Sequence, residues 1–153
     1  MPRNNNTQRS GSPLYWSAES WAIITLRLFL ALRLLTAGLG KFKRADNTYS
    51  FDNYYEKVVP WIINSFAEST NLWSFLVAPY AYAIAYVEIT LGALLFAGVK
   101  TKYMLALVGL TLVSLAFGQM LLKGGALNEI GTLLIMNTAA LYFVRHNKLE
   151  ALR

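Results

Sequence analysis

Four long apolar segments dominate the pattern of this 153-residue chain. They run over Trp21–Leu39, Leu72–Gly98, Tyr103–Leu122 and Ala126–Val144. A helix rises about 1.5 Å per residue, so roughly 20 residues cross the hydrocarbon core of a bilayer. Each segment is close to that length or above it, although Asn128, Glu129 and Asn137 interrupt the fourth. The pattern therefore predicts an all-α integral membrane protein, an antiparallel bundle of four transmembrane helices.

The connections between these segments are unequal. Val99–Lys102 and Lys123–Gly125 are short and join antiparallel neighbours, whereas residues 40–78 form a long first loop. Within this loop, Phe51–Phe66 mixes charged with large apolar residues. Such a segment is typical of one or two short interfacial helices, which we expect to be broken near Pro60.

The chain divides into a membrane domain and two tails. Residues 1–16 are polar and predict a flexible N-terminal tail, residues 17–148 form the four-helix domain, and residues 149–153 form a short C-terminal tail. Proline suits a first helical turn, so the second span is expected to begin near Pro79. Lys and Arg are slightly more numerous on the side of the two termini, which favours cytoplasmic termini.

Three charged side chains lie deep inside the first two apolar segments: Arg27, Arg33 and Glu88. A charge near the bilayer centre costs from about 2.5 to well over 10 kcal/mol, so it normally faces the bundle and is paired. If both helices span fully, all three residues lie within about 5 Å of the midplane. We therefore expect Glu88 to pair with Arg27 or Arg33. On a helical wheel, Arg27 shares a face with Gly38 and Lys41.

Two interpretations of these charges remain open. In the first, the ion pair only fixes helix packing. In the second, two arginines against one glutamate leave a positive charge that binds a quinone carbonyl, an anionic head group or a substrate oxyanion. The binding residues would then be Arg27, Arg33, Lys41 and Glu88, and no catalytic residue is assigned.

Composition narrows the possible functions. The chain is 14% charged, whereas a soluble domain usually carries about a quarter charged residues. It has no cysteine, which excludes disulfides, iron–sulfur clusters and thiolate zinc sites, and His146 alone excludes a bis-histidine haem within the subunit. We expect no metal and no cofactor bound by this chain alone, although a quinone is possible. The net charge of +6 is scattered, which favours contact with anionic lipid over nucleic acid.

The first loop is rich in aromatic side chains. Such side chains are found in membrane-interface belts and in binding hot spots. One interpretation is therefore a helix resting on lipid, and the other is a surface that docks a partner subunit. The candidate docking residues are Tyr54, Tyr55, Trp61, Phe66 and Trp73.

Two patches of the sequence resemble a known family. They are LRLFLALRLLTAGLGKF over Leu26–Phe42 and AYVEITLGALLFAGVKTK over Ala85–Lys102. The matching elements are an LR pair, AG-x-x-K-F, and E-x-x-x-G-x-x-L-x-x-G-x-x-T-[KR]. They fall on Leu26, Arg27, Ala37, Gly38, Lys41 and Phe42, then on Glu88, Gly92, Leu95, Gly98, Thr101 and Lys102. Over about residues 20–148, the chain is similar to the DoxX family of small bacterial and archaeal membrane proteins.

The resemblance implies a four-helix bundle in the cytoplasmic membrane of a bacterium or archaeon. Founding members of the family are subunits of a terminal oxidase and of a thiosulfate:quinone oxidoreductase, whereas most others have no assigned activity. The longer aromatic loop and Arg33 depart from the simpler members. We expect an accessory, non-catalytic subunit of a larger, quinone-linked membrane complex. The alternatives are a stand-alone quinone-dependent oxidoreductase, and a small transporter or lipid-binding protein.

Overall fold

The computed structural model describes residues 17–70, 74–122 and 127–146, which are almost entirely helical. The helices are α1 (Ala18–Gly40), α2 (Phe51–Asn53), a π-helical turn (Tyr54–Val58), α3 (Val59–Thr70), α4 (Ser74–Ala97), α5 (Thr101–Leu121) and α6 (Leu127–His146). Four stretches are long and apolar enough to cross a membrane: α1, residues 77–97 of α4, α5, and residues 127–144 of α6. The predicted all-α, four-span architecture is confirmed.

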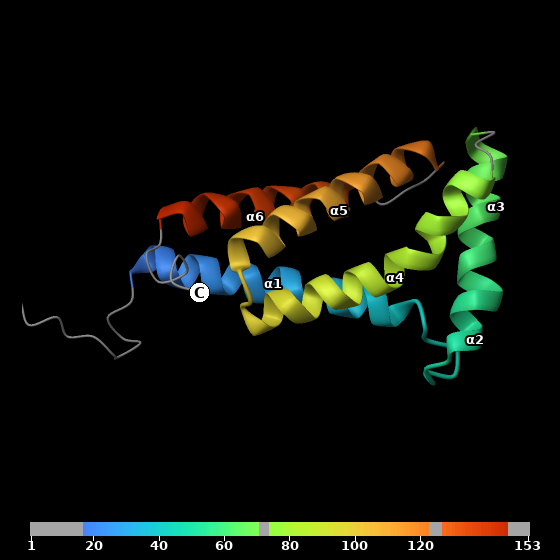
Figure 1. Ribbon diagram of the computed structural model, residues 1–153, viewed down its shortest axis with the longest axis horizontal. Coiled ribbons are helices and arrows are strands. Elements are labelled where there is room, and N and C mark those ends of the chain that lie inside the picture. Colours follow the sequence, from blue (N-terminus) through green and yellow to red (C-terminus); the bar gives the residue numbers. More distant parts are fainter. Residues whose placement is uncertain (1–16, 71–73, 123–126, 147–153) are drawn as a thin grey trace, which may run out of the picture.

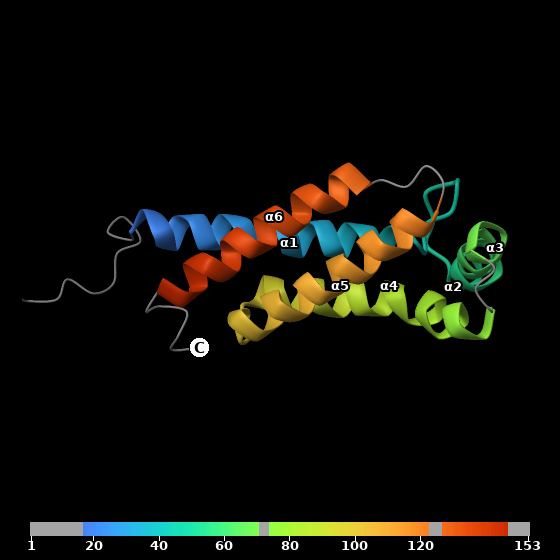
Figure 2. The same ribbon diagram turned by 90° about the horizontal axis from the view of Figure 1, so that it is seen from above.

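The four long helices run along a common direction, and α3 lies across one end of them (Figure 1, Figure 2). Helix α1 packs mainly on α4 and on α6, and α5 packs on α6. The start of α1 and the end of α6 lie at the end of the bundle opposite α3 (Figure 1). If the spans cross the membrane upright, α3 lies along the membrane surface, as expected for an interfacial helix.

Helices α1 and α4 approach each other closely through two glycines. A Cβ atom added to Gly38 would lie 3.0 Å from the carbonyl oxygen of Ala85, and one added to Gly92 would lie 3.0 Å from that of Ala31. Small residues at such positions allow the backbones of membrane helices to meet. The two contacts fix the antiparallel register of α1 against α4.

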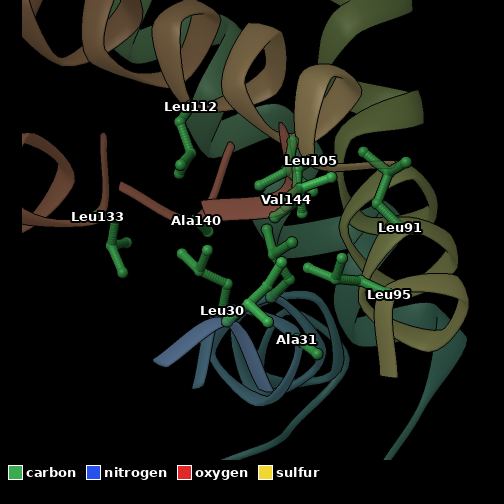
Figure 3. Close-up of a cluster of buried hydrophobic side chains, with 12 residues drawn as sticks. Leu30, Ala31, Leu91, Leu95, Leu105, Leu112, Leu133, Ala140 and Val144 are labelled. Carbon is green, nitrogen blue, oxygen red and sulfur yellow. The ribbon is translucent and has the colours of Figure 1, made fainter. Parts of the chain in front are cut away.

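Apolar side chains from all four spans form the central core (Figure 3). Leu30, Leu95 and Leu105 are at most 1% exposed there. Around the outside of the bundle, Leu110 is 68% and Ile135 is 73% exposed. Apolar side chains on both the inside and the outside are the distribution expected of a bundle surrounded by lipid.

A single helical stretch covers residues 51–70, so the predicted break near Pro60 was wrong. Proline lacks an N–H group, and its ring clashes with the carbonyl group four residues earlier in a regular α-helix. Here the wider π-helical turn Tyr54–Val58 comes directly before Val59 and Pro60. The helix therefore continues through Pro60, with its backbone widened in the turn just before the proline.

Helix α4 begins at Ser74 and contains Pro79, so the residues just before the proline belong to the same helix. The apolar stretch that can span the membrane begins at residue 77, close to the predicted start near Pro79. The hydroxyl group of the fully buried Tyr54 donates a hydrogen bond to the carbonyl oxygen of Ala81 (2.6 Å) and accepts one from the N–H of Ala85 (3.4 Å). A side chain inserted into the hydrogen-bond ladder bends a helix. Figure 1 shows the N-terminal part of α4 bending towards α3.

A short hairpin follows α1 and holds the end of that helix in place. Lys43 and Tyr49 form an isolated antiparallel bridge, and Asn47 adopts a φ of 66° in the turn between them. The side-chain amide of Asn53 donates a hydrogen bond to the carbonyl oxygen of Lys43 (2.9 Å). The hairpin thereby fixes the position of Lys41 at the end of the bundle nearest α3.

Candidate functional site

The carboxylate of Glu88, on α4, pairs with the ammonium group of Lys41 at the end of α1. Glu88 is only 2% exposed, and the Lys41 ammonium group also reaches the carbonyl oxygen of Ala37 (3.4 Å). A buried carboxylate without a partner would be strongly destabilising. The expectation that Glu88 pairs with Arg27 or Arg33 was therefore wrong about the partner.

The register of α1 against α4 explains this difference. With Gly38 against Ala85, and Gly92 against Ala31, Glu88 lies level with Ala37. Lys41 and Arg33 then lie one helical turn to either side of Glu88. Arg27 is ten residues from Ala37, which is about 15 Å along the helix. The two spans are thus offset along their axes rather than centred at the same depth.

Arg27 lies at the C-terminal end of α4, far from Lys41. Gly98 ends that helix with a φ of 76°, and the N–H of Val99 bonds to the carbonyl oxygen of Leu94 (3.1 Å). A Cβ atom on Gly98 would lie 2.9 Å from Nη1 of Arg27, so the guanidinium group packs directly on this turn. A cation is favoured at the negative end of a helix dipole. The structure gives Arg27 a packing role and places it outside the site around Glu88.

Arg33 pairs with Glu129, in the first turn of α6. The two side chains are 38% and 52% exposed. This pair joins the first and last spans, which lie next to each other in the bundle. No partner of Glu129 was predicted from the sequence, so this contact is a finding of the structure.

A cavity of about 160 Å³ lies between the four spans, and we call it the inner cavity. Its walls are mostly leucine, with valine, isoleucine and alanine, and its charged lining residues are Arg33, Glu88 and Glu129. Leu30 and Leu112, two of the wall residues, are labelled in Figure 3. The exposure of Arg33 and Glu129 places the mouth of the cavity between α1 and α6. The cavity lies in the half of the bundle nearer α3.

The charges around the inner cavity balance. Arg33 and Lys41 supply two positive charges, and Glu88 and Glu129 supply two negative charges. The sequence predicted a residual positive charge, from two arginines against one glutamate. These four residues carry no such charge, because Arg27 lies elsewhere and Glu129 adds a second negative charge. Such a site favours a neutral polar ligand over an anion. The side-chain amide of Asn137 lies apart from the inner cavity, against Gly109 at the contact between α5 and α6.

The aromatic residues of the first loop divide into buried and exposed groups. Tyr54 and Phe66 lie on the buried side of the helical stretch over residues 51–70. Burial raises the pKa of the Tyr54 hydroxyl group. Tyr54 and Phe66 are therefore core residues rather than docking residues. Tyr55 is 42% exposed and shares a hydrogen bond with the Tyr86 hydroxyl group (2.6 Å), while Trp61 is 63% exposed. Docking through Tyr55 and Trp61 stays a prediction, and the candidate Trp73 lies outside the described residues.

The described part of the chain contains no group of three or more His, Cys, Asp or Glu side chains that could hold a metal ion. The comparisons with known proteins give one match. The DoxX family model matches residues 22–121, about two thirds of the chain, from α1 through α5. No curated protein and no solved structure matches. The chain is therefore a multi-pass membrane protein and belongs to the DoxX family.

Proposed function

We propose that this protein is an accessory membrane subunit of a larger quinone-linked complex, without an electron carrier of its own, and that its inner cavity holds the ring of the quinone. The observation that carries the proposal is the size and lining of this cavity. An apolar cavity of about 150 Å³ holds one benzene molecule. A cavity of about 160 Å³ with apolar walls therefore accepts a single six-membered ring. The mouth between α1 and α6 leaves room for an apolar tail to remain in the lipid.

The charged residues favour a quinone over an anionic head group. A quinone ring is neutral and carries carbonyl oxygens that accept hydrogen bonds. The guanidinium group of Arg33 lines the cavity and is a suitable donor. A phosphate or carboxylate would meet Glu88 and Glu129 as well as Arg33, so repulsion would offset much of the attraction.

The subunit role rests on what the chain's own residues can carry. Reduction of a quinone needs two electrons, and a sequence without cysteine and with one histidine cannot hold an iron–sulfur cluster or a bis-histidine haem by itself. Electrons would come from a redox subunit. The exposed aromatic residues Tyr55 and Trp61 are our candidates for docking a partner at the α3 end. We place the complex in the cytoplasmic membrane of a bacterium or archaeon. The end of the bundle where α1 begins and α6 ends would face the cytoplasm.

The test is mild detergent extraction from the native membrane, followed by determination of the mass of the complex and of its quinone content. The variant Leu112→Phe fills the inner cavity without changing a charge, since Leu112 is 2% exposed and lines it. Val113→Phe is the matched control, because Val113 is 55% exposed on the same helix. We expect comigration with redox subunits in all three proteins, and at least a fivefold loss of quinone in Leu112→Phe alone.

Two outcomes would contradict the proposal. An isolated monomer or homo-oligomer that reduces quinone would support the stand-alone oxidoreductase instead. A wild-type complex without bound quinone, or equal quinone content in Leu112→Phe and wild type, would remove the inner cavity as the quinone site.

A further inference from the structure

A second cavity of about 160 Å³ lies beneath α3, and we call it the outer cavity. It is bounded by residues of α3, α4 and α5 and by Lys41. Its polar lining groups include Lys41, Tyr80 and Gln119, and the exposed Trp61 lies at its edge. A water molecule occupies about 30 Å³ and needs two to four polar partners. The outer cavity therefore has room for more than one water molecule, and these three side chains offer polar groups at its wall.

The two cavities meet at the Lys41–Glu88 pair. Lys41 lines the outer cavity, Glu88 lines the inner cavity, and their charged groups are in direct contact. Leu115 lines both cavities and is apolar. Among the lining residues of the two cavities, the ion pair is therefore the polar connection across the wall that separates them.

We infer that protons reach the inner cavity from the α3 side of the membrane, through the outer cavity, Lys41 and Glu88. This inference rests on the proposed function, because it assigns the proton supply of the quinone site. In this route Glu88 and Lys41 act as a relay, and the ligand itself enters from the lipid between α1 and α6.

The transfer balances with water as the proton source. The Lys41 ammonium group gives a proton to the Glu88 carboxylate, and Glu88 passes that proton to a carbonyl oxygen of the substrate. The neutral Lys41 amine then takes a proton from water in the outer cavity, which restores the ion pair, and a proton from the solution on the α3 side neutralises the hydroxide ion that is left. Two such transfers accompany the two electrons that a redox subunit supplies, so quinone becomes quinol.

Other charged groups face Glu88, and they define the competing route. Arg33 lies one turn away on α1, and it pairs with Glu129 of α6 at the mouth of the inner cavity. The side chain of Glu129 is 52% exposed. Protons that entered at this mouth would pass through Glu129, and Lys41 would then take no part in proton transfer to the inner cavity. The experiments below separate the two routes.

The first experiment measures access of water to the outer cavity, and no native cysteine interferes. Ile84→Cys places a thiol in the outer cavity, and Leu105→Cys places one in the core, away from both cavities. Both native side chains are at most 4% exposed. A small charged methanethiosulfonate reagent is added to sealed vesicles from the α3 side. We expect Ile84→Cys to react at least tenfold faster than Leu105→Cys, and equal rates would overturn the inference.

The second experiment measures proton delivery in the intact complex. In Lys41→Met combined with Glu88→Gln, no buried charge is left without a partner. We therefore expect quinone content and assembly to stay within twofold of wild type while quinone reduction slows at least tenfold. Lys102→Met, an exposed lysine at the other end of the bundle, is the matched control. Slowed proton delivery also raises the solvent deuterium isotope effect, which a purely structural defect would not do. A rate that depends on Glu129 and not on Lys41 would place proton entry at the mouth of the inner cavity.

The two proposals fail in different ways. A wild-type complex that holds no quinone would overturn the proposed function, and this inference with it. Slow labelling of Ile84→Cys in a complex that does hold quinone would overturn the inference alone.

Discussion

The substitution Gly92→Ala tests whether the contact between α1 and α4 is as close as the structure shows. The added Cβ atom would lie 2.9 Å from Cγ of Leu35 and 3.0 Å from both the Leu35 nitrogen and the Ala31 carbonyl oxygen. Ordinary van der Waals contact begins near 3.4 Å. Two of these three atoms are backbone, so relief requires α1 and α4 to separate by roughly half an ångström. A gap of that size forfeits about a quarter of each dispersion contact that it opens.

The expected cost follows from these contacts. Overpacking of a tight interface costs about 1–3 kcal/mol, and the better helix propensity of alanine returns about 0.5–1 kcal/mol. The difference between the two ranges is about 0–2.5 kcal/mol, and we expect a net destabilisation in its middle part, about 1–2 kcal/mol. For a chain of this size, each kcal/mol lowers the melting temperature by roughly 2–4 °C. We expect Gly92→Ala to melt about 2–8 °C below wild type in detergent.

The control is Gly131→Ala in α6. A Cβ atom there would have no heavy atom within 4 Å, so only the helix propensity changes. This variant is expected to melt at or slightly above the wild-type temperature. Thermal unfolding of the three purified proteins in one detergent gives the comparison. A Gly92→Ala protein as stable as Gly131→Ala would refute the close packing and, with it, the register that places Glu88 beside Lys41.

Three further predictions concern other parts of the structure. Gly98→Ala places a side chain at a φ of 76° and against Arg27. Thermal unfolding in detergent should therefore show that the free energy of unfolding falls by about 1–2 kcal/mol. Unchanged stability would contradict the packing of Arg27 on this turn. Tyr54→Phe leaves a buried α4 carbonyl group without its donor and should cost about 1–3 kcal/mol. Because burial raises the pKa of Tyr54, its contribution is complete below pH 10 and is lost as the pH rises further, so raising the pH above 10 should lower the melting temperature of wild type more than that of Tyr54→Phe. Tyr55→Ala combined with Trp61→Ala should release the protein from its complex with its own melting temperature preserved, and retention at wild-type stoichiometry would exclude docking by this pair.

Hydropathy was sufficient to predict the four spans, because the length and apolar character of each segment are local properties of the sequence. The path of the first loop was less predictable. A proline at position 60 or 79 normally ends or begins a helix. Here a π-helical turn precedes Pro60, and the Tyr54 hydroxyl group bonds to the backbone of α4 two residues beyond Pro79. A single-sequence pattern reveals neither the π-helical turn nor this contact between the first loop and α4.

The partners of the charged residues depended on register, which hydropathy does not specify. Centring both spans on the same midplane placed Glu88 beside Arg27 and Arg33, whereas the glycine contacts place it beside Lys41. Gly38 and Gly92 were visible in the sequence as small residues near charges. Pairing each of them with the facing helix would have predicted the offset. Glu129 was harder to place, because its contact with Arg33 joins the first and last spans.

The central claim, that the inner cavity holds a quinone ring, is tested most directly by photolabelling with an azidoquinone in the intact complex. Mass spectrometry of the labelled peptides then identifies the modified residues. We predict labels on cavity residues such as Leu30, Leu112 and Leu133, and loss of these labels in Leu112→Phe. Labels confined to outward-facing residues such as Leu110 and Phe117, unchanged in Leu112→Phe, would contradict the claim.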